Sequence, residues 1–96
     1  MKYGLSGNFK AKKGTGGELL AILEDAANLM KDAEGCVVYI VGQQSDNQDR
    51  IHVFEVWDSK EDHDKSLHVV GVRELIAKAM LFFDGQPTGV DIDIVG

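Results

Sequence analysis

Alternating apolar and polar positions predict a β-strand at each end of the chain. From Tyr3 to Ala11, and again across residues 90–95, apolar side chains recur at almost every second position. This period of two is typical of strands with one face against a core. Residues 36–41 instead form an unbroken apolar run rich in β-branched side chains, which indicates a strand buried on both faces. A fourth strand is predicted at residues 51–57, after a polar connection at residues 45–49.

Apolar residues at every third or fourth position predict a helix after the first strand. The stripe covers residues 19–33, and Gly35 beyond it suits the left-handed conformation that ends many helices. Thr15 and Glu18 have the spacing of a capping box, in which their side chains hydrogen-bond to unpaired amides of the first turn. A helix is therefore expected between the first two strands.

A second helical segment is expected to begin after Ser59, whose hydroxyl can cap it. Its apolar stripe continues to Phe83, and Gly71 is expected to interrupt or bend the helix. The resulting order is β-α-β-β-α-β within a single domain, residues 1–96. This order predicts an α+β fold, a ferredoxin-like sandwich with both crossover helices on one face of the sheet.

The second face of that sheet has no covering layer in the sequence. The apolar run places Tyr39 and Val41 on one side of its strand and Cys36, Val38 and Ile40 on the other. Two helices can cover only one side of a four-stranded sheet. We therefore expect a homodimer in which two copies pack sheet to sheet about a two-fold axis.

Composition excludes several classes of partner. Lys and Arg total 10 against 16 Asp and Glu, a formal net charge of −6, so no extended positive surface is available for nucleic acid or an anionic membrane. Cys36 is the only cysteine, so no intrachain disulfide can form. Without a signal peptide or a membrane-spanning stretch in this sequence, the expected location is cytoplasmic.

The three histidines do not predict a metal site. His63 and His68 are five residues apart, which turns them about 140 degrees from each other on a helix. His52 lies on a different predicted element, so no paired spacing typical of zinc ligands occurs. The glycines at 14, 16 and 17 lack the rest of a phosphate-binding motif, and a turn before the helix explains them better.

The segment from Trp57 to Leu67 is the best candidate for a binding site. His63 shares a helical face with Ser66, Leu67 and Val70, so it points inward if the apolar residues do. An inward imidazole serves either as a half-buried structural group or as part of a pocket, and the sequence leaves both open. For Trp57, packing at the end of a core strand is favoured over a role in the pocket.

Several segments of the chain resemble the antibiotic biosynthesis monooxygenase (ABM) domain family, in particular its small quinol monooxygenase members. The most specific are the strand end at residues 55–57, the helix start at residues 59–61 and the segment at residues 63–67, and the resemblance covers nearly the whole chain. It implies a dimeric α+β barrel with a pocket between helices and sheet. It also implies oxygenation of quinols or polycyclic phenols without flavin, haem or metal. The positions that haem-degrading relatives use carry Gly7, Ser66 and Ile76 here, so that activity is not expected.

The leading hypothesis is a cofactor-independent monooxygenase that acts on a quinol-like or polycyclic phenolic molecule with dioxygen. Such substrates supply their own electrons to dioxygen once deprotonated, so the protein has to bind them, exclude water and assist proton transfer. His63 is the catalytic candidate, because it can orient the hydroxyl or accept its proton. The candidate substrate-binding residues are Trp57 and Tyr39 as flat apolar walls, with Asn8, Ser66 and Arg73 as polar contacts.

The alternative hypothesis is a non-catalytic dimeric α+β barrel that binds a small hydrophobic metabolite or serves as an interaction module. Few polar residues can be placed in one pocket from the sequence alone, which is what favours this alternative. Oxygen consumption in the presence of hydroquinones separates the two hypotheses.

Overall fold

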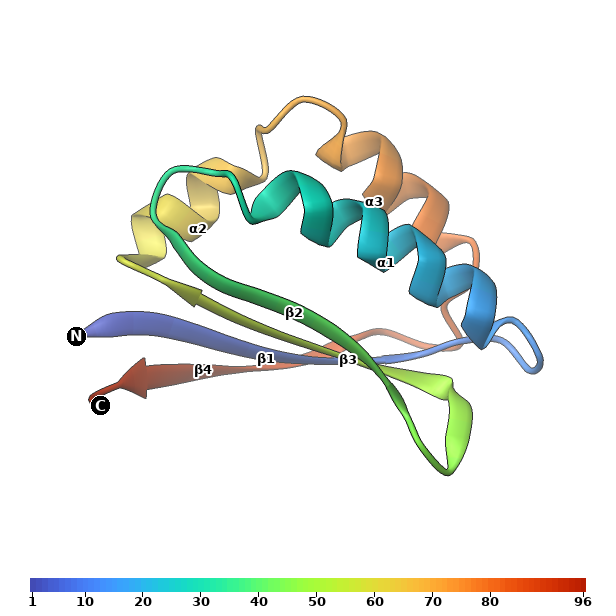
Figure 1. Cartoon of the computed structure of the whole chain (residues 1–96). Coiled ribbons are helices and arrows are strands. Elements are labelled where there is room, and N and C mark those ends of the chain that lie inside the picture. Colours follow the sequence, from blue (N-terminus) through green and yellow to red (C-terminus); the bar gives the residue numbers. More distant parts are fainter.

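The computed structural model describes residues 1–96 and consists of a four-stranded antiparallel sheet with three helices on one face (Figure 1). The strands lie in the order β2-β3-β1-β4, which confirms the predicted α+β, ferredoxin-like fold. No helix is both long and apolar enough to cross a membrane. The elements are β1 (Lys2–Lys10), α1 (Gly16–Met30), β2 (Cys36–Gln44), β3 (Asn47–Trp57), α2 (Lys60–Ser66), α3 (Val72–Met80) and β4 (Thr88–Ile94).

Two boundaries differ from the sequence-based expectation. The second helical segment is two helices, because α2 ends at Ser66 and α3 begins only after Gly71, whose φ of 94° is left-handed. Gly71 therefore interrupts the segment, as one of the two predicted outcomes. The connection between β2 and β3 is shorter than residues 45–49, since strand pairing already resumes at Asn47.

The start of α1 is held by a neighbouring strand instead of by the predicted capping box. The Thr15 side chain makes no capping bond and donates to the Lys12 carbonyl oxygen, 2.6 Å away. The Asp49 carboxylate of β3 accepts hydrogen bonds from the Gly14 and Gly16 amides, each at 3.0 Å. A carboxylate from another element satisfies the same unpaired amides as a local cap. The capping-box prediction was therefore wrong in its residues.

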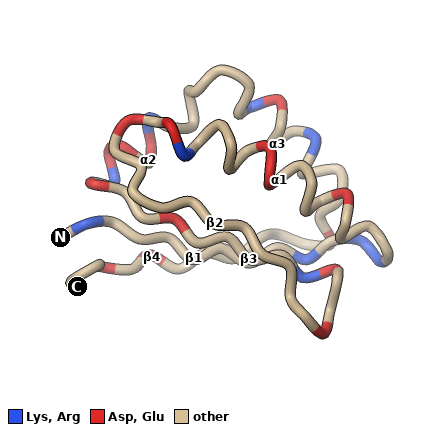
Figure 2. Tube along the Cα trace, in the orientation of Figure 1, with Lys and Arg blue, Asp and Glu red and all other residues tan.

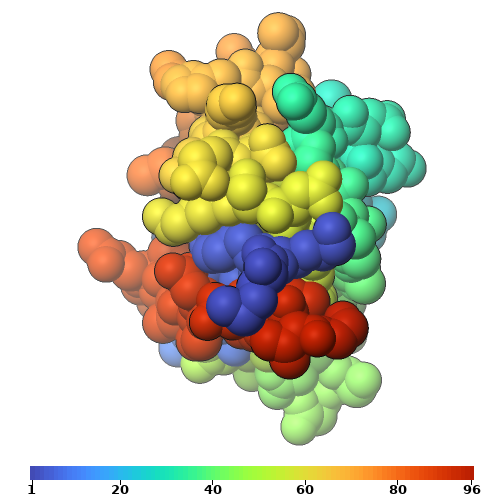
Figure 3. Space-filling view, turned by 90° about the vertical axis from the view of Figure 1, so that its left-hand side faces the viewer, coloured from blue at the N-terminus to red at the C-terminus, as the bar shows by residue number.

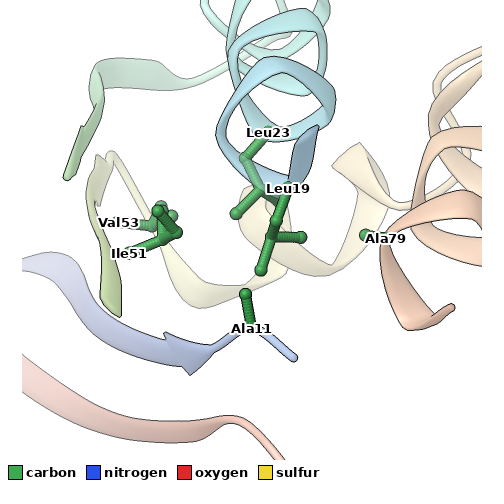
Figure 4. Close-up of a cluster of buried hydrophobic side chains, with 6 residues drawn as sticks. All are labelled: Ala11, Leu19, Leu23, Ile51, Val53 and Ala79. Carbon is green, nitrogen blue, oxygen red and sulfur yellow. The ribbon is translucent and has the colours of Figure 1, made fainter. Parts of the chain in front are cut away.

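The core lies between α1 and the helix-facing side of the sheet. A cluster of buried side chains joins α1 to β3 and the end of β1, and it reaches α3 (Figure 4): Ala11, Leu19, Leu23, Ile51, Val53 and Ala79. Leu19 and Ile51 are completely buried. A second, smaller cluster contains Met30, Trp57 and Val72. These two clusters fix α1 on the half of the sheet formed by β2 and β3.

The opposite face of the sheet carries apolar side chains and has no helix over it (Figure 1). Residues directly opposite in paired strands share a face, and two such rows cross the sheet: Val38, Val56, Gly4 and Ile92, and Ile40, Phe54, Ser6 and Val90. Ile40 is 58% exposed and Val90 is 62% exposed. Cys36 does not join this face, because an irregularity in pairing between Cys36 and Val38 turns it toward Trp57 and the helices.

Helix α2 closes one end of the space between helices and sheet. Its start is capped as predicted, since the Ser59 hydroxyl accepts a hydrogen bond from the Asp62 amide at 3.1 Å. Figure 3 views this end and shows α2 (yellow) directly above the start of β1 (blue), with the end of β4 (red) below. Gly35 allows α2 to pack closely against the segment before β2, because a side chain at position 35 would overlap Asp62. Helix α2 therefore brings His63 close to the ends of β1 and β3.

Candidate active site

A cavity of about 730 Å³ lies between the helices and the sheet. Sixteen residues line it, of which 11 are hydrophobic and none is Lys or Arg. One apolar wall comes from α1 and another from α3, with the sheet as the floor: Leu23, Ala26 and Met30, then Val72, Ile76 and Met80. The basic residues are instead spread over several elements of the chain (Figure 2). The cavity therefore suits an apolar molecule without anionic groups.

The two ends of the cavity differ in chemistry. Glu55 and His63 line one end, whereas Phe9, Phe83 and Pro87 line the other. The rings of Phe9 and Phe83 pack with their centroids 5.5 Å apart. Phe9 lies four residues along β1 from the position opposite Glu55, which corresponds to about 13 Å of extended strand. The space is thus elongated, with one polar and one aromatic end.

Glu55 is the buried polar group at the floor of the cavity. It lies between Tyr39 and Leu5 in the paired strands and is 7% exposed. Its Oε1 accepts a hydrogen bond from the Trp57 indole Nε1 at 2.9 Å. Burial raises the pKa of Glu55, while the Trp57 hydrogen bond and the nearby His63 lower it. A carboxyl group held in this way is typical of functional sites.

His63 reaches the same end of the cavity from α2. Its Nε2 is 3.8 Å from the Glu55 Oε1, and its Nδ1 is 3.0 Å from the Oδ1 of Asp64. The imidazole lies between two aromatic rings, with centroid distances of 5.4 Å to Tyr3 and 6.0 Å to Trp57. One ring nitrogen thus faces a buried carboxyl group, and the other faces a carboxylate at the surface.

Two tyrosines lie near this pair. Tyr39 lines the cavity beside Glu55, and burial, followed by the charge of Glu55, raises the pKa of its phenol. The Tyr3 hydroxyl donates to Asp91 at 2.8 Å, and burial together with this bond raises the pKa of Tyr3 to about 12. Both phenols therefore stay protonated near neutral pH.

The other residues predicted for the site do not line the cavity. Trp57 is completely buried among core side chains and supports Glu55 through its indole. Ser66 is buried and donates to the His63 carbonyl oxygen. Asn8 lies on the uncovered face, where Arg50 donates to it. Arg73 is exposed and contacts His68. Of the predicted site residues, His63 and Tyr39 are therefore the two that line this cavity.

The sequence interpretation missed Glu55 as a site residue. The signal was present in the alternation of β3, since Ile51, Val53, Glu55 and Trp57 are all two residues apart and share the helix-facing side. A carboxylate between Val53 and Trp57 in that register has to point into the core. The helical argument for His63 was incomplete as well, because Val70 lies beyond the end of α2 and is 92% exposed.

The fold and the cavity define a class of protein: small ferredoxin-like α+β domains with a binding cavity between helices and sheet. The sequence model of one such family, antibiotic biosynthesis monooxygenase, matches residues 3–78. The chain therefore belongs to the antibiotic biosynthesis monooxygenase family. No curated protein sequence matches the chain.

Solved structures agree with this assignment. A Chloroflexus aurantiacus protein named after the antibiotic biosynthesis monooxygenases is 34% identical, with a TM-score of 0.88 over 100% of this chain and 95% of that chain. A similarly named Caulobacter crescentus protein is 19% identical, with a TM-score of 0.89 over 99% and 91% of the two chains. The Streptomyces nogalater cofactor-independent oxygenase SnoaB is 12% identical, with a TM-score of 0.83 over 97% and 92%. The last two likenesses concern the fold alone.

Proposed function

We propose that this chain is a cofactor-independent monooxygenase that oxygenates a quinol-like or polycyclic phenolic molecule. The observation that carries the proposal is the elongated apolar cavity that ends on a buried carboxyl group and an imidazole. Family membership supports it, as does the description of SnoaB, a protein of the same fold, as a cofactor-independent oxygenase. The proposed substrate lies with its hydroxyl at the Glu55 and His63 end and its rings toward Phe9 and Phe83.

The proposed reaction draws all of its electrons from the substrate. Deprotonation of a hydroxyl leaves an electron-rich phenolate that can reduce dioxygen. One oxygen atom enters the product, and the other leaves as water together with two hydrogens that the substrate loses. The four electrons needed for this reduction come from the same molecule, so the balance requires no further reductant. The protein contributes a dry enclosure and a group that moves the proton.

Two of the predicted residues keep direct roles in this proposal. His63 orients the substrate hydroxyl or takes part in moving its proton, since its ring nitrogen Nε2 faces the interior. Tyr39 provides a flat wall beside the reacting end. Trp57 acts from behind the wall by holding Glu55.

Oxygen consumption tests the proposal. Purified protein with a panel of hydroquinones and anthrones is expected to consume oxygen faster than the same solution without protein. The variant His63→Ala is expected to consume oxygen at least about tenfold more slowly, because general acid–base groups contribute this much or more to a rate. His68→Ala serves as the matched control, since His68 is exposed and lies outside the cavity wall. Tight binding of panel members without any acceleration would instead support the non-catalytic binding module.

We also propose that two copies pair through the uncovered face of the sheet. The rows that contain Val38 and Ile40 expose apolar surface that a second copy of the same face can bury. Sedimentation at micromolar concentration is expected to give a dimer. Ile40→Lys should shift the equilibrium toward the monomer, whereas Val70→Lys, at an even more exposed position on the helix side, should not. A compact wild-type monomer would contradict this pairing.

A further inference from the structure

Glu55 is unusual because it is buried with no Lys or Arg as partner, and His63 is the only residue with which it can form an ion pair. Its side chain is 9% exposed, and its near polar neighbours are the Trp57 indole and the His63 ring. No Lys or Arg lines the cavity. A buried carboxylate without a cation is strongly disfavoured, and such groups exchange protons instead of remaining charged. A purely structural role at this position would be filled at lower energetic cost by a neutral side chain.

We propose that Glu55 is the group that accepts the hydroxyl proton from the molecule in the cavity, and that it shares this proton with His63. This inference rests on the proposed function for the identity of the molecule as a phenol. It makes Glu55, which lies on β3 at the floor of the cavity, the first group to accept the proton. His63 then becomes the second holder of the proton.

The other ionisable groups around Glu55 cannot take this role. Tyr39 and Cys36 on β2 and Tyr3 on β1 all have pKa values raised by burial, so they stay protonated and offer no vacant site for a proton. Helices α1 and α3 present only apolar side chains to the cavity. His63 of α2, which has Asp64 beside it, is therefore the only other group near Glu55 that can hold the proton.

The geometry of His63 fits a proton holder. The surface carboxylate of Asp64 accepts from Nδ1–H at 3.0 Å, which fixes the proton of the neutral ring on Nδ1. The lone pair of Nε2 is then directed toward Glu55, 3.8 Å away. A small movement of the ring brings these atoms into hydrogen-bonding distance. Asp64 is thus a positioning residue that acts through His63.

The proposed transfer balances in protons and charge. The substrate O–H bond breaks, its electron pair stays on the substrate oxygen, and an O–H bond forms on the Glu55 carboxylate. That proton passes to Nε2 of His63, which becomes an imidazolium between two carboxylates. The proton later returns to the reduced oxygen atom that leaves as water. No net proton is gained or lost by the protein.

A coloured phenol tests the first step without any oxidation. Bound 4-nitrophenol is expected to show its phenolate absorption at a pH below the pKa of the free phenol in wild-type protein, and to remain neutral in Glu55→Gln. The Gln side chain keeps an oxygen for the Trp57 indole. Glu61→Gln, an exposed change on the same helix as His63, is the matched control and should behave as wild type. Equal phenolate in wild type and Glu55→Gln would overturn the proposal.

A titration of the unliganded wild-type protein decides the same question independently of any ligand or variant fold. The side-chain carboxyl carbon of Glu55, followed by nuclear magnetic resonance, is expected to titrate at higher pH than the surface glutamates. The His63 ring nitrogens are expected to show the Nδ1–H tautomer that the contact with Asp64 favours. Titration of Glu55 together with the surface glutamates would overturn the proposal.

The two proposals can fail separately. Absence of oxygen uptake with every phenol, combined with the shifted Glu55 titration, removes the oxygenase activity and leaves Glu55 as a proton acceptor. Oxygen uptake that persists at the wild-type rate in Glu55→Gln removes the role of Glu55 and leaves the oxygenase. If both proposals hold, Glu55→Gln lowers the rate by about 100-fold and flattens the acidic side of its pH profile.

Discussion

Helices α1 and α3 lie on the same face of the sheet but have different relations to it. Helix α1 packs directly on β2 and β3, and its side chains Leu19 and Leu23 enter the main core. Helix α3 packs chiefly on α1, and its side chains Ile76 and Met80 face the cavity and remain 41% and 61% exposed. The comparison suggests that the α1 half carries the stability of the fold and the α3 half forms a roof over the binding space.

The largest expected effect is a difference in the free energy of unfolding between a truncation in α1 and a similar truncation in α3. Leu19→Ala is expected to lower the free energy of unfolding by about 2 to 5 kcal/mol, because Leu19 is completely buried in the core. Ile76→Ala removes a similar volume from the cavity wall and should lower it by less than about 1 kcal/mol. Urea unfolding of both variants measures the difference. Equal losses would mean that α3 is as much a part of the core as α1.

A smaller effect tests how closely the start of α1 is held to β3. A side chain at Gly16 would overlap the backbone oxygen of Gln48, whereas one at Gly17 would meet nothing. Gly16→Ala should therefore lower the free energy of unfolding by about 1 to 3 kcal/mol. Gly17→Ala should raise it by about 0.4 to 1 kcal/mol, because it restricts the unfolded chain. A Gly16→Ala protein as stable as wild type would show that α1 can move away from the strand.

The smallest expected effect is a change in how the free energy of unfolding depends on pH, and it comes from Glu55 on the floor of the cavity. Glu55 has a raised pKa in the folded state, so the folded protein binds more protons than the unfolded chain between the ordinary value, 4.5, and the raised one. Stability is therefore expected to fall as pH rises through this window. Glu55→Gln should remove that decline and be more stable than wild type at mildly alkaline pH. Thermal melting across the window measures both slopes, and parallel slopes would contradict the buried position of Glu55.

Much of the fold follows from local sequence patterns. The period-two alternation and the apolar stripe of α1 are strong local signals, and Ser59 caps α2 as its position predicted. The cap of α1 was not predictable in the same way, since Asp49 comes from a strand more than thirty residues away. The inward turn of Cys36 depends on an irregularity in strand pairing, which cannot be read from the alternation of residues in the sequence.

The candidate site was harder to predict than the fold. The structure places His63 in the cavity wall, but Asn8 and Arg73 elsewhere. The position of Asn8 was predictable, because Asn8 is next to Phe9 in β1 and so lies on the opposite face. Glu55 was overlooked although its alternation with Val53 and Trp57 placed it inside. A charged residue in an apolar register is therefore more informative than polar residues taken one at a time.

Trp57 is the only tryptophan of the chain, and its indole nitrogen donates directly to Glu55. Indole emission responds to the charge of its hydrogen-bond acceptor, so the fluorescence of the unlabelled protein should change when Glu55 gains or loses its proton. The same ring lies behind the cavity wall and is shielded from solvent. The molecule thus contains a built-in optical indicator for the one group on which its proposed chemistry depends, readable in stopped-flow experiments without a dye.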